Sequence, residues 1–128
     1  MKLRDADPAG VLFFARYLAL AHDAYEAFMD ARGVSFGLLL REVNYIIPVV
    51  HAESDYRVPL WAGEKFQVRL WVHTIRRRSF AIAYELRRAD GTLSCTAQTV
   101  HAVVDKTTRR AIPLPQKVRQ ALETHSTR

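Results

Sequence analysis

Two carboxylates precede the clearest helical segment of the chain. Asp5 and Asp7 lie in a turn-rich stretch that ends at Gly10, and a helix is predicted to begin among residues 10–14. The free N–H groups and the dipole of a helix N-terminus stabilise a nearby carboxylate in its charged form. An ionised aspartate there can act as a nucleophile or a general base, and the N–H groups can hold an oxyanion. On this pattern alone, capping and turn roles for both aspartates are favoured.

A basic run, Arg76-Arg77-Arg78-Ser79, lies between two segments of alternating polarity. Three guanidinium groups and a hydroxyl can bind phosphate through charge-assisted hydrogen bonds, although a solvated turn between strands has the same composition. Arginine provides 15 of the 19 basic residues, and the formal net charge is +6. This excess indicates a phosphate-bearing partner, either nucleic acid or a nucleotide cofactor. Nucleic acid is disfavoured because neither interleaved aromatic residues nor a nucleic-acid motif accompanies the run.

Two other patterns indicate no chemistry. Gly33-Val34-Ser35-Phe36-Gly37 matches the G-x-S-x-G of serine hydrolases, but it follows a helix, and the chain is too short for that fold. The histidines lack the H-x-H or H-E-x-x-H spacing of metal ligands, so no metal site is predicted. These histidines are His22, His51, His73, His101 and His125.

The elements that must position these residues follow from hydrophobic periodicity. Apolar residues recur at three- and four-residue spacing between residues 14 and 29, and Gly33 is the predicted C-terminal cap. This helix is apolar around most of its circumference, so we expect it to be enclosed. Period-two alternation predicts strands within residues 50–58, 66–73, 80–86 and 93–104, with a hairpin turn at Asp90-Gly91 and a short, exposed helical tail over 117–124. Residues 34–47 are ambiguous, with a possible helical turn at 36–40.

Helix first and strands second favours an α+β fold in which an antiparallel sheet curls around the helix, and excludes alternating βαβ units. A length of 128 residues, 49% of them hydrophobic, fits one domain over residues 1–128. The single cysteine excludes a disulfide framework. No apolar run approaches a membrane span and no signal-peptide core is present, so we expect a cytoplasmic protein.

The run Asp5-Ala6-Asp7-Pro8-Ala9-Gly10-Val11-Leu12-Phe13-Phe14, followed by a long apolar helix, resembles the D-x-D-x-x-G signature of hotdog-fold acyl-CoA thioesterases. The resemblance is to the 4-hydroxybenzoyl-CoA thioesterase branch. It extends through Arg76-Arg77-Arg78-Ser79-Phe80 to the closing segment Ala111-Ile112-Pro113-Leu114-Pro115, so nearly the whole chain is covered.

The resemblance implies a hotdog fold and an active site between two subunits of a homodimer or homotetramer. Coenzyme A would enter as part of the substrate, without a further cofactor, a nucleic acid or a membrane. The resemblance implies that Asp7 is the catalytic carboxylate and that the backbone N–H of Phe14 binds the oxyanion. The residues implied around the acyl group are Phe13, Phe14, Tyr17 and His22. The residues implied at the nucleotide phosphates of coenzyme A are Arg76, Arg77, Arg78 and Ser79.

Several alternatives stay open. The strings His22-Asp23-Ala24-Tyr25-Glu26 and Pro48-Val49-Val50-His51-Ala52 are more similar to 1,4-dihydroxy-2-naphthoyl-CoA hydrolases, which places that substrate ahead of 4-hydroxybenzoyl-CoA. Asp23 or Glu26 could supply the catalytic acid, although the acidic turn favours Asp7. Asp7 could attack the thioester directly or activate water. An aliphatic acyl-CoA, an acyl-carrier-protein thioester, and a non-catalytic module that binds acyl-CoA or nucleic acid are the competing functions.

Overall fold

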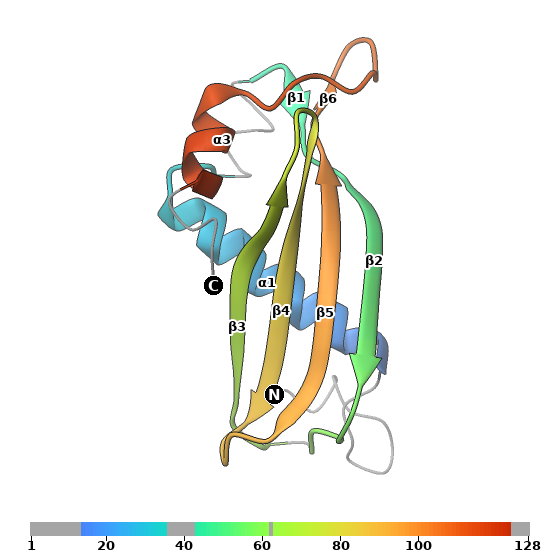
Figure 1. Cartoon of the computed structure of the whole chain (residues 1–128), viewed down its shortest axis with the longest axis vertical. Coiled ribbons are helices and arrows are strands. Elements are labelled where there is room, and N and C mark those ends of the chain that lie inside the picture. The colour runs from blue at the N-terminus through green and yellow to red at the C-terminus, as the bar shows by residue number, and fades with distance from the viewer. Residues whose placement is uncertain (1–13, 36–42, 62, 124–128) are drawn as a thin grey trace.

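The structure is a computed structural model, and it describes residues 14–35, 43–61 and 63–123. The chain forms two helices and six strands over these residues (Figure 1). In chain order they are α1 (Phe14–Ala31), β1 (Tyr45–Ile46), β2 (Val49–Tyr56), β3 (Phe66–Ile75), β4 (Ser79–Arg88), β5 (Leu93–Ala102), β6 (Val104–Asp105) and α3 (Gln116–Glu123).

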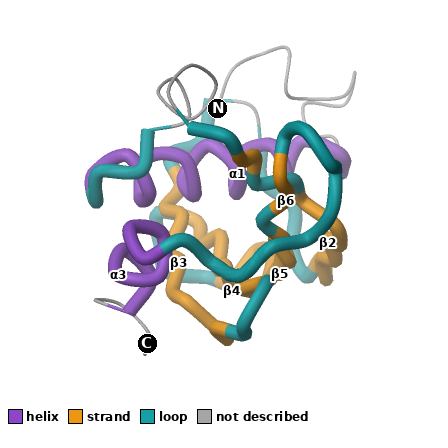
Figure 2. The backbone as a smooth tube through the Cα atoms, turned by 90° about the horizontal axis from the view of Figure 1, so that it is seen from above, coloured by secondary structure: helices purple, strands orange, loops and turns teal. Residues whose placement is uncertain are grey.

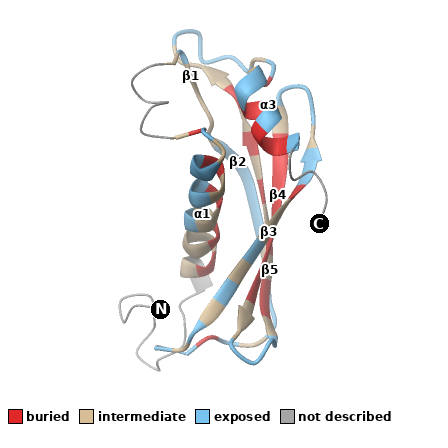
Figure 3. Cartoon of the chain, turned by 90° about the vertical axis from the view of Figure 1, so that its left-hand side faces the viewer, coloured by how far each residue is buried: buried red, intermediate tan, exposed pale blue. Residues whose placement is uncertain are grey.

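The four long strands form one antiparallel sheet in the order β2-β5-β4-β3, and β1 pairs with β6 in a separate two-stranded ladder. α1 crosses one face of the sheet diagonally, with its first residues beside the end of β2 (Figure 1). The views along the other axes show the same two layers, with the helix on one side of the strands (Figures 2 and 3). The predicted α+β class with an antiparallel sheet is confirmed.

The core lies between α1 and the sheet. Tyr17, Ala21, Tyr25 and Met29 recur every four residues on α1, and all are buried, because positions four apart lie on one helix face. Alternate residues of β4 and β5 meet this stripe from the sheet side. They are Phe80, Ile82, Tyr84, Leu86, Cys95, Ala97, Thr99 and His101. The period-two pattern of the sequence therefore identifies the core face of both central strands correctly.

Two predicted chain reversals are confirmed, and both depend on glycine. Gly33 has φ +84°, and the bonds from Val34 N–H to the Met29 carbonyl (2.9 Å) and from Gly33 N–H to Asp30 (3.0 Å) close α1 in a Schellman motif. Gly91 has φ +89° in the β4–β5 hairpin. Side chains other than glycine rarely adopt these angles, so both turns are encoded locally.

The C-terminal helix differs from its prediction. The tail is not exposed, because Val118, Ala121 and Leu122 of α3 are buried in the same core as Met29 and Val34. These three residues share one helix face, and α3 packs on β3 (Figure 3). A short polar helix with one apolar stripe of this kind closes the end of the core.

Two finer predictions about the sheet also change. The predicted strand over 93–104 is divided into β5 and β6 at Val103, and β6 pairs with β1, which lies in the ambiguous segment. The enclosure of a long central helix is not confirmed: α1 has 18 residues and lies along one face of the sheet. Residues 36–40, where a helical turn was predicted, fall outside the described residues.

Candidate active site

The start of α1 is the first part of the candidate site. Phe14 is the first helical residue, and the first turn contains no acidic side chain. The N–H groups of a first helical turn have no acceptor within the helix, and the helix dipole is positive there. This end of α1 can therefore stabilise a carboxylate or a developing oxyanion. Asp7 and Phe13 lie outside the described residues, so their predicted roles, and that of the Phe14 N–H, stay predictions.

Tyr17 lies one helical turn further on and is 3% exposed. Its hydroxyl accepts a hydrogen bond from the backbone N–H of Leu60 (3.2 Å) and lies 3.5 Å from the Ser94 hydroxyl. Its ring and the ring of Tyr56 of β2 pack edge to face, with ring centroids 4.9 Å apart and an interplanar angle of 70°. The hydroxyl of Tyr17 therefore bonds within the fold and its ring is buried in the core, so the predicted acyl contact stays a prediction.

His22 lies further along α1. Its Nε2 is 2.9 Å from the Glu26 carboxylate, one turn later, and its ring centroid is 5.5 Å from that of Tyr25. Eight residues separate it from Phe14, which is about 12 Å along a helix. The described residues therefore do not bring His22 to the helix start, and its contact with an acyl group stays a prediction.

A buried aromatic stack connects α1 to β4 and β5. The ring of His101 is fully buried, with centroids 4.2 Å from Tyr25 and 4.9 Å from Phe80. Its Nε2 is 2.7 Å from the hydroxyl of Thr99, and its Nδ1 has no hydrogen-bond partner among the described residues. Burial, and secondarily the nearby charge of His22, lowers the pKa of His101 to about 3, so the imidazole is neutral at physiological pH.

The arginine run forms the β3–β4 turn. Arg76 N–H donates to the Ser79 carbonyl (2.8 Å), and the carbonyls of Arg77 and Arg78 accept from Leu114 and Val103 (2.8 and 3.2 Å). The backbone of this turn is therefore fixed against the C-terminal segment, whereas all three arginine side chains are exposed. A turn with a fixed backbone and exposed guanidinium groups suits anion binding.

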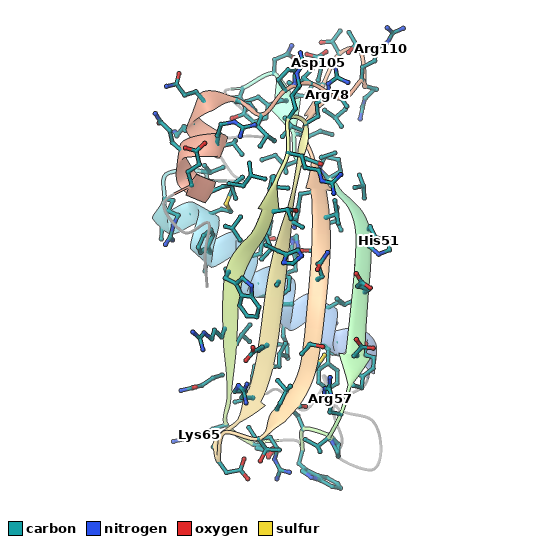
Figure 4. The ribbon with its side chains drawn as sticks, viewed as in Figure 1. His51, Arg57, Lys65, Arg78, Asp105 and Arg110 are labelled. Atoms are coloured by element: carbon teal, nitrogen blue, oxygen red, sulfur yellow. The ribbon has the colours of Figure 1, made fainter. Side chains whose placement is uncertain are left out.

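A second basic loop lies at the same end of the molecule, and the sequence prediction missed it. Figure 4 places Arg78 near Asp105 and Arg110. Asp105 accepts hydrogen bonds from the N–H groups of Thr107 (3.1 Å) and Thr108 (2.7 Å), which closes the loop tightly. The only signal in the sequence was Arg109-Arg110, two adjacent basic residues between the final strand and Pro113. We call the 76–78 turn and the 106–110 loop together the basic end.

The two parts of the candidate site lie at opposite ends of the sheet. The arginine turn joins β3 to β4 at one end, while α1 begins beside the end of β2 near the other (Figure 1). A strand of ten residues, such as β4, spans about 33 Å. Within one chain, the structure therefore separates the predicted phosphate-binding residues from the start of α1.

Comparison with known proteins places this geometry in a family. The Thioesterase-like superfamily matches residues 1–122. The chain belongs to this superfamily. A 1,4-dihydroxy-2-naphthoyl-CoA hydrolase of Rippkaea orientalis is 34% identical to it over 125 residues, covering 96% of this chain and 91% of the relative. The corresponding hydrolase of Synechococcus elongatus is 33% identical, covering 96% and 90%.

A solved structure of the superfamily agrees with the fold. The 1,4-dihydroxy-2-naphthoyl-CoA thioesterase of Synechocystis superposes on this chain with a TM-score of 0.90 at 30% identity, covering 95% of this chain and 90% of that one. The resemblance drawn from the acidic turn and the arginine run is confirmed at the level of the family.

The face of this thioesterase-family sheet opposite α1 has a hollow of about 460 Å³. Its walls include the side chains of Glu53, Asp55, Trp71 and Glu85, and none of the predicted site residues lines it. Among the described residues there is also no cluster of three or more potential metal ligands. None of the helices in this part of the chain is long and apolar enough to cross a membrane. The start of α1 and the basic end remain the candidate site.

Proposed function

We propose that this protein hydrolyses the thioester of an aromatic acyl-CoA to the free acid and coenzyme A. The substrate ranked first is 1,4-dihydroxy-2-naphthoyl-CoA, and 4-hydroxybenzoyl-CoA is second. The observation that supports this most strongly is identity of 34% and 33%, over nearly the whole chain, to hydrolases of the first substrate. We take residues 1–128 as a single thioesterase domain acting in the cytoplasm, without a cofactor beyond the coenzyme A of its substrate.

In this proposal, the thioester carbonyl lies at the first turn of α1. The N–H of Phe14 donates to the carbonyl oxygen, and the helix dipole stabilises the negative charge that develops there. Asp7, ionised, either attacks the carbonyl carbon to form an anhydride that water cleaves, or removes a proton from the attacking water. In both routes the C–S bond breaks and coenzyme A leaves as a thiol. Phe13, Phe14, Tyr17 and His22 line the acyl site.

The nucleotide phosphates bind at the basic end, through Arg76, Arg77, Arg78 and Ser79. Exposed guanidinium groups on a fixed turn bind phosphate with little loss of backbone entropy. Because the helix start lies at the opposite end of the sheet, two subunits must contribute to one site. A homodimer or homotetramer with its active site at the subunit interface satisfies this requirement.

The free edge of β2 supports such an assembly. β2 pairs with β5 on one side, and within the described chain no strand pairs with its other side. Its eight residues are largely exposed, including Val50 at 59%, and exposed edge strands are templates for pairing. Antiparallel pairing of two β2 strands keeps both α1 helices on one face and places the helix start of one subunit toward the basic end of the other. The joined sheet would then enclose the helices as the hotdog arrangement requires.

Thiol release from an acyl-CoA panel tests the function. Wild-type protein should cleave the hydroxynaphthoyl and hydroxybenzoyl thioesters faster than a straight-chain thioester. Asp7→Asn should lower kcat by a factor of about 10² to 10⁴, the contribution of a positioned acid–base group, with KM changed much less. The matched control is Asp23→Asn, an exposed aspartate of α1, which should retain turnover. Full turnover in Asp7→Asn would refute the role of Asp7.

A further inference from the structure

Tyr56 is a half-exposed aromatic residue at the end of the edge strand. It is the last residue of β2 and is 45% exposed, which is unusual for a large aromatic side chain. Its ring contacts the buried ring of Tyr17 edge to face, at a centroid distance of 4.9 Å. One side of the phenol is therefore held by the core, and nearly half of the residue is exposed on the α1 side of the sheet.

A second contact orients the phenol. Ser54 lies two residues earlier, on the same face of β2, because strand side chains alternate. Its hydroxyl donates a hydrogen bond of 2.7 Å to the Tyr56 hydroxyl oxygen. The ring of Tyr56 is thus held by the ring of Tyr17, and its hydroxyl is held by Ser54. Tyrosine with a fixed ring and an accessible surface is typical of ligand and partner contacts, since little side-chain entropy remains to be lost.

The position of Tyr56 relative to the helix start decides what it can contact. Tyr17, its ring partner, lies three residues after Phe14, which is about 4.5 Å along the helix axis. Figure 1 shows the end of β2 beside the N-terminus of α1. Tyr56 therefore lies next to the first turn of α1, where the proposed function places the thioester carbonyl. An acyl group attached to a carbonyl at that turn can reach Tyr56.

We infer that Tyr56 contacts the aromatic acyl group and selects hydroxylated aryl thioesters, with Ser54 as its positioning residue. This inference rests on the proposed function. Aromatic rings pair favourably beyond the area they bury, which an alkyl chain does not reproduce. The hydroxyls of Ser54 and Tyr56 can form hydrogen bonds with a hydroxyl on the acyl ring. Tyr56 was absent from the sequence prediction, where it was one of several alternating strand residues.

The test compares specificity constants for three thioesters: 1,4-dihydroxy-2-naphthoyl-CoA, benzoyl-CoA and hexanoyl-CoA. Tyr56→Leu should lower kcat/KM for the naphthoyl substrate about tenfold and for hexanoyl-CoA less than twofold. Tyr56→Phe and Ser54→Ala should each lower the preference for the dihydroxynaphthoyl over the benzoyl substrate two- to fivefold. The double variant should lose no more than either single variant, and Ser54→Thr should retain the preference, because it keeps the hydroxyl.

The matched control is Trp71→Leu, which alters an aromatic residue that lines the hollow on the opposite face of the sheet. It should leave kcat/KM for all three thioesters unchanged. Circular dichroism and size-exclusion chromatography of each variant report folding and assembly. If folded, correctly assembled Tyr56→Leu keeps the wild-type ratio of naphthoyl to hexanoyl turnover, the inference is wrong.

A second readout separates this inference from the proposed function. Binding of 1,4-dihydroxy-2-naphthoic acid, the free acid, is measured by titration calorimetry with wild type and Tyr56→Leu. Wild-type protein that cleaves none of the thioesters refutes the proposed function. The inference about Tyr56 would still be supported by at least fivefold weaker binding in Tyr56→Leu, and equal dissociation constants would overturn it.

Discussion

Acidification from pH 7.5 to 4.5 should destabilise this protein through His101, whose imidazole is fully buried between Tyr25 and Phe80. Burial and the neighbouring His22 lower its pKa from the ordinary value of 6.5 to about 3 in the folded state. As the pH falls through 6.5, the unfolded chain gains a proton on this imidazole and the native protein does not. The free energy of unfolding therefore decreases with falling pH until the folded pKa is reached.

The magnitude follows from the pH range over which only the unfolded state binds the extra proton. Between pH 6.5 and 4.5 the unfolded state holds one more proton at this site, at about 1.4 kcal/mol per pH unit. The contribution of His101 to the loss of stability at pH 4.5 is thus about 3 kcal/mol, a large part of the 5–15 kcal/mol typical of a domain. At pH 7.5 the imidazole is neutral in both states and contributes no such difference.

The assay is urea unfolding at fixed protein concentration, because assembly shifts apparent stability. His101→Gln removes the titrating group and keeps a polar atom for the Thr99 hydroxyl, so its free energy of unfolding should fall less steeply below pH 6.5. The control is Val103→Ala, a buried neighbour in the chain, which should lower stability at every pH and keep the wild-type slope. Parallel curves for wild type and His101→Gln would refute the assigned protonation state.

Two further predictions concern the candidate site. Arg77→Ala should raise KM for acyl-CoA about tenfold and change kcat less than twofold, because a charge-assisted phosphate contact acts on binding. The control is Arg69→Ala, on β3 rather than in the turn, which should leave KM unchanged. An unchanged KM in Arg77→Ala would show that Arg77 is a solvated turn residue that does not bind phosphate. Tyr17→Phe should cost about 1–3 kcal/mol in urea unfolding, because the buried N–H of Leu60 loses its acceptor, while kcat/KM stays within twofold. A large loss of kcat/KM in the folded variant would show that the hydroxyl serves the reaction as well.

The elements of the fold were readable from local patterns. The cap at Gly33 and the hairpin at Asp90-Gly91 required only residues that tolerate positive φ. The alternation along β4 and β5 predicted which side chains face the core, since a strand has one periodicity whatever covers it. The family resemblance depended on residue types at fixed spacing, and these too are properties of the chain alone.

Other features depend on which elements meet, and the sequence could not supply them. The three buried residues of α3 looked like an exposed tail, because an eight-residue helix shows its apolar stripe but not the surface that receives it. β1 has two residues and is defined only by its pairing with β6. The hydroxyl of Tyr17 accepts a hydrogen bond from the N–H of Leu60, 43 residues later in the chain, and no local pattern indicates that contact.

The acidic turn, the apolar helix and the arginine run are properties of the sequence, and they carry much of the resemblance to thioesterases. Their arrangement in space was decided by the tertiary structure. Register and strand order put the start of α1 and the 76–78 turn at opposite ends of one sheet, and they put Tyr56 beside the helix start. The physical reason is that side-chain periodicity is local, while strand order and helix docking come from burying surfaces that are distant in sequence.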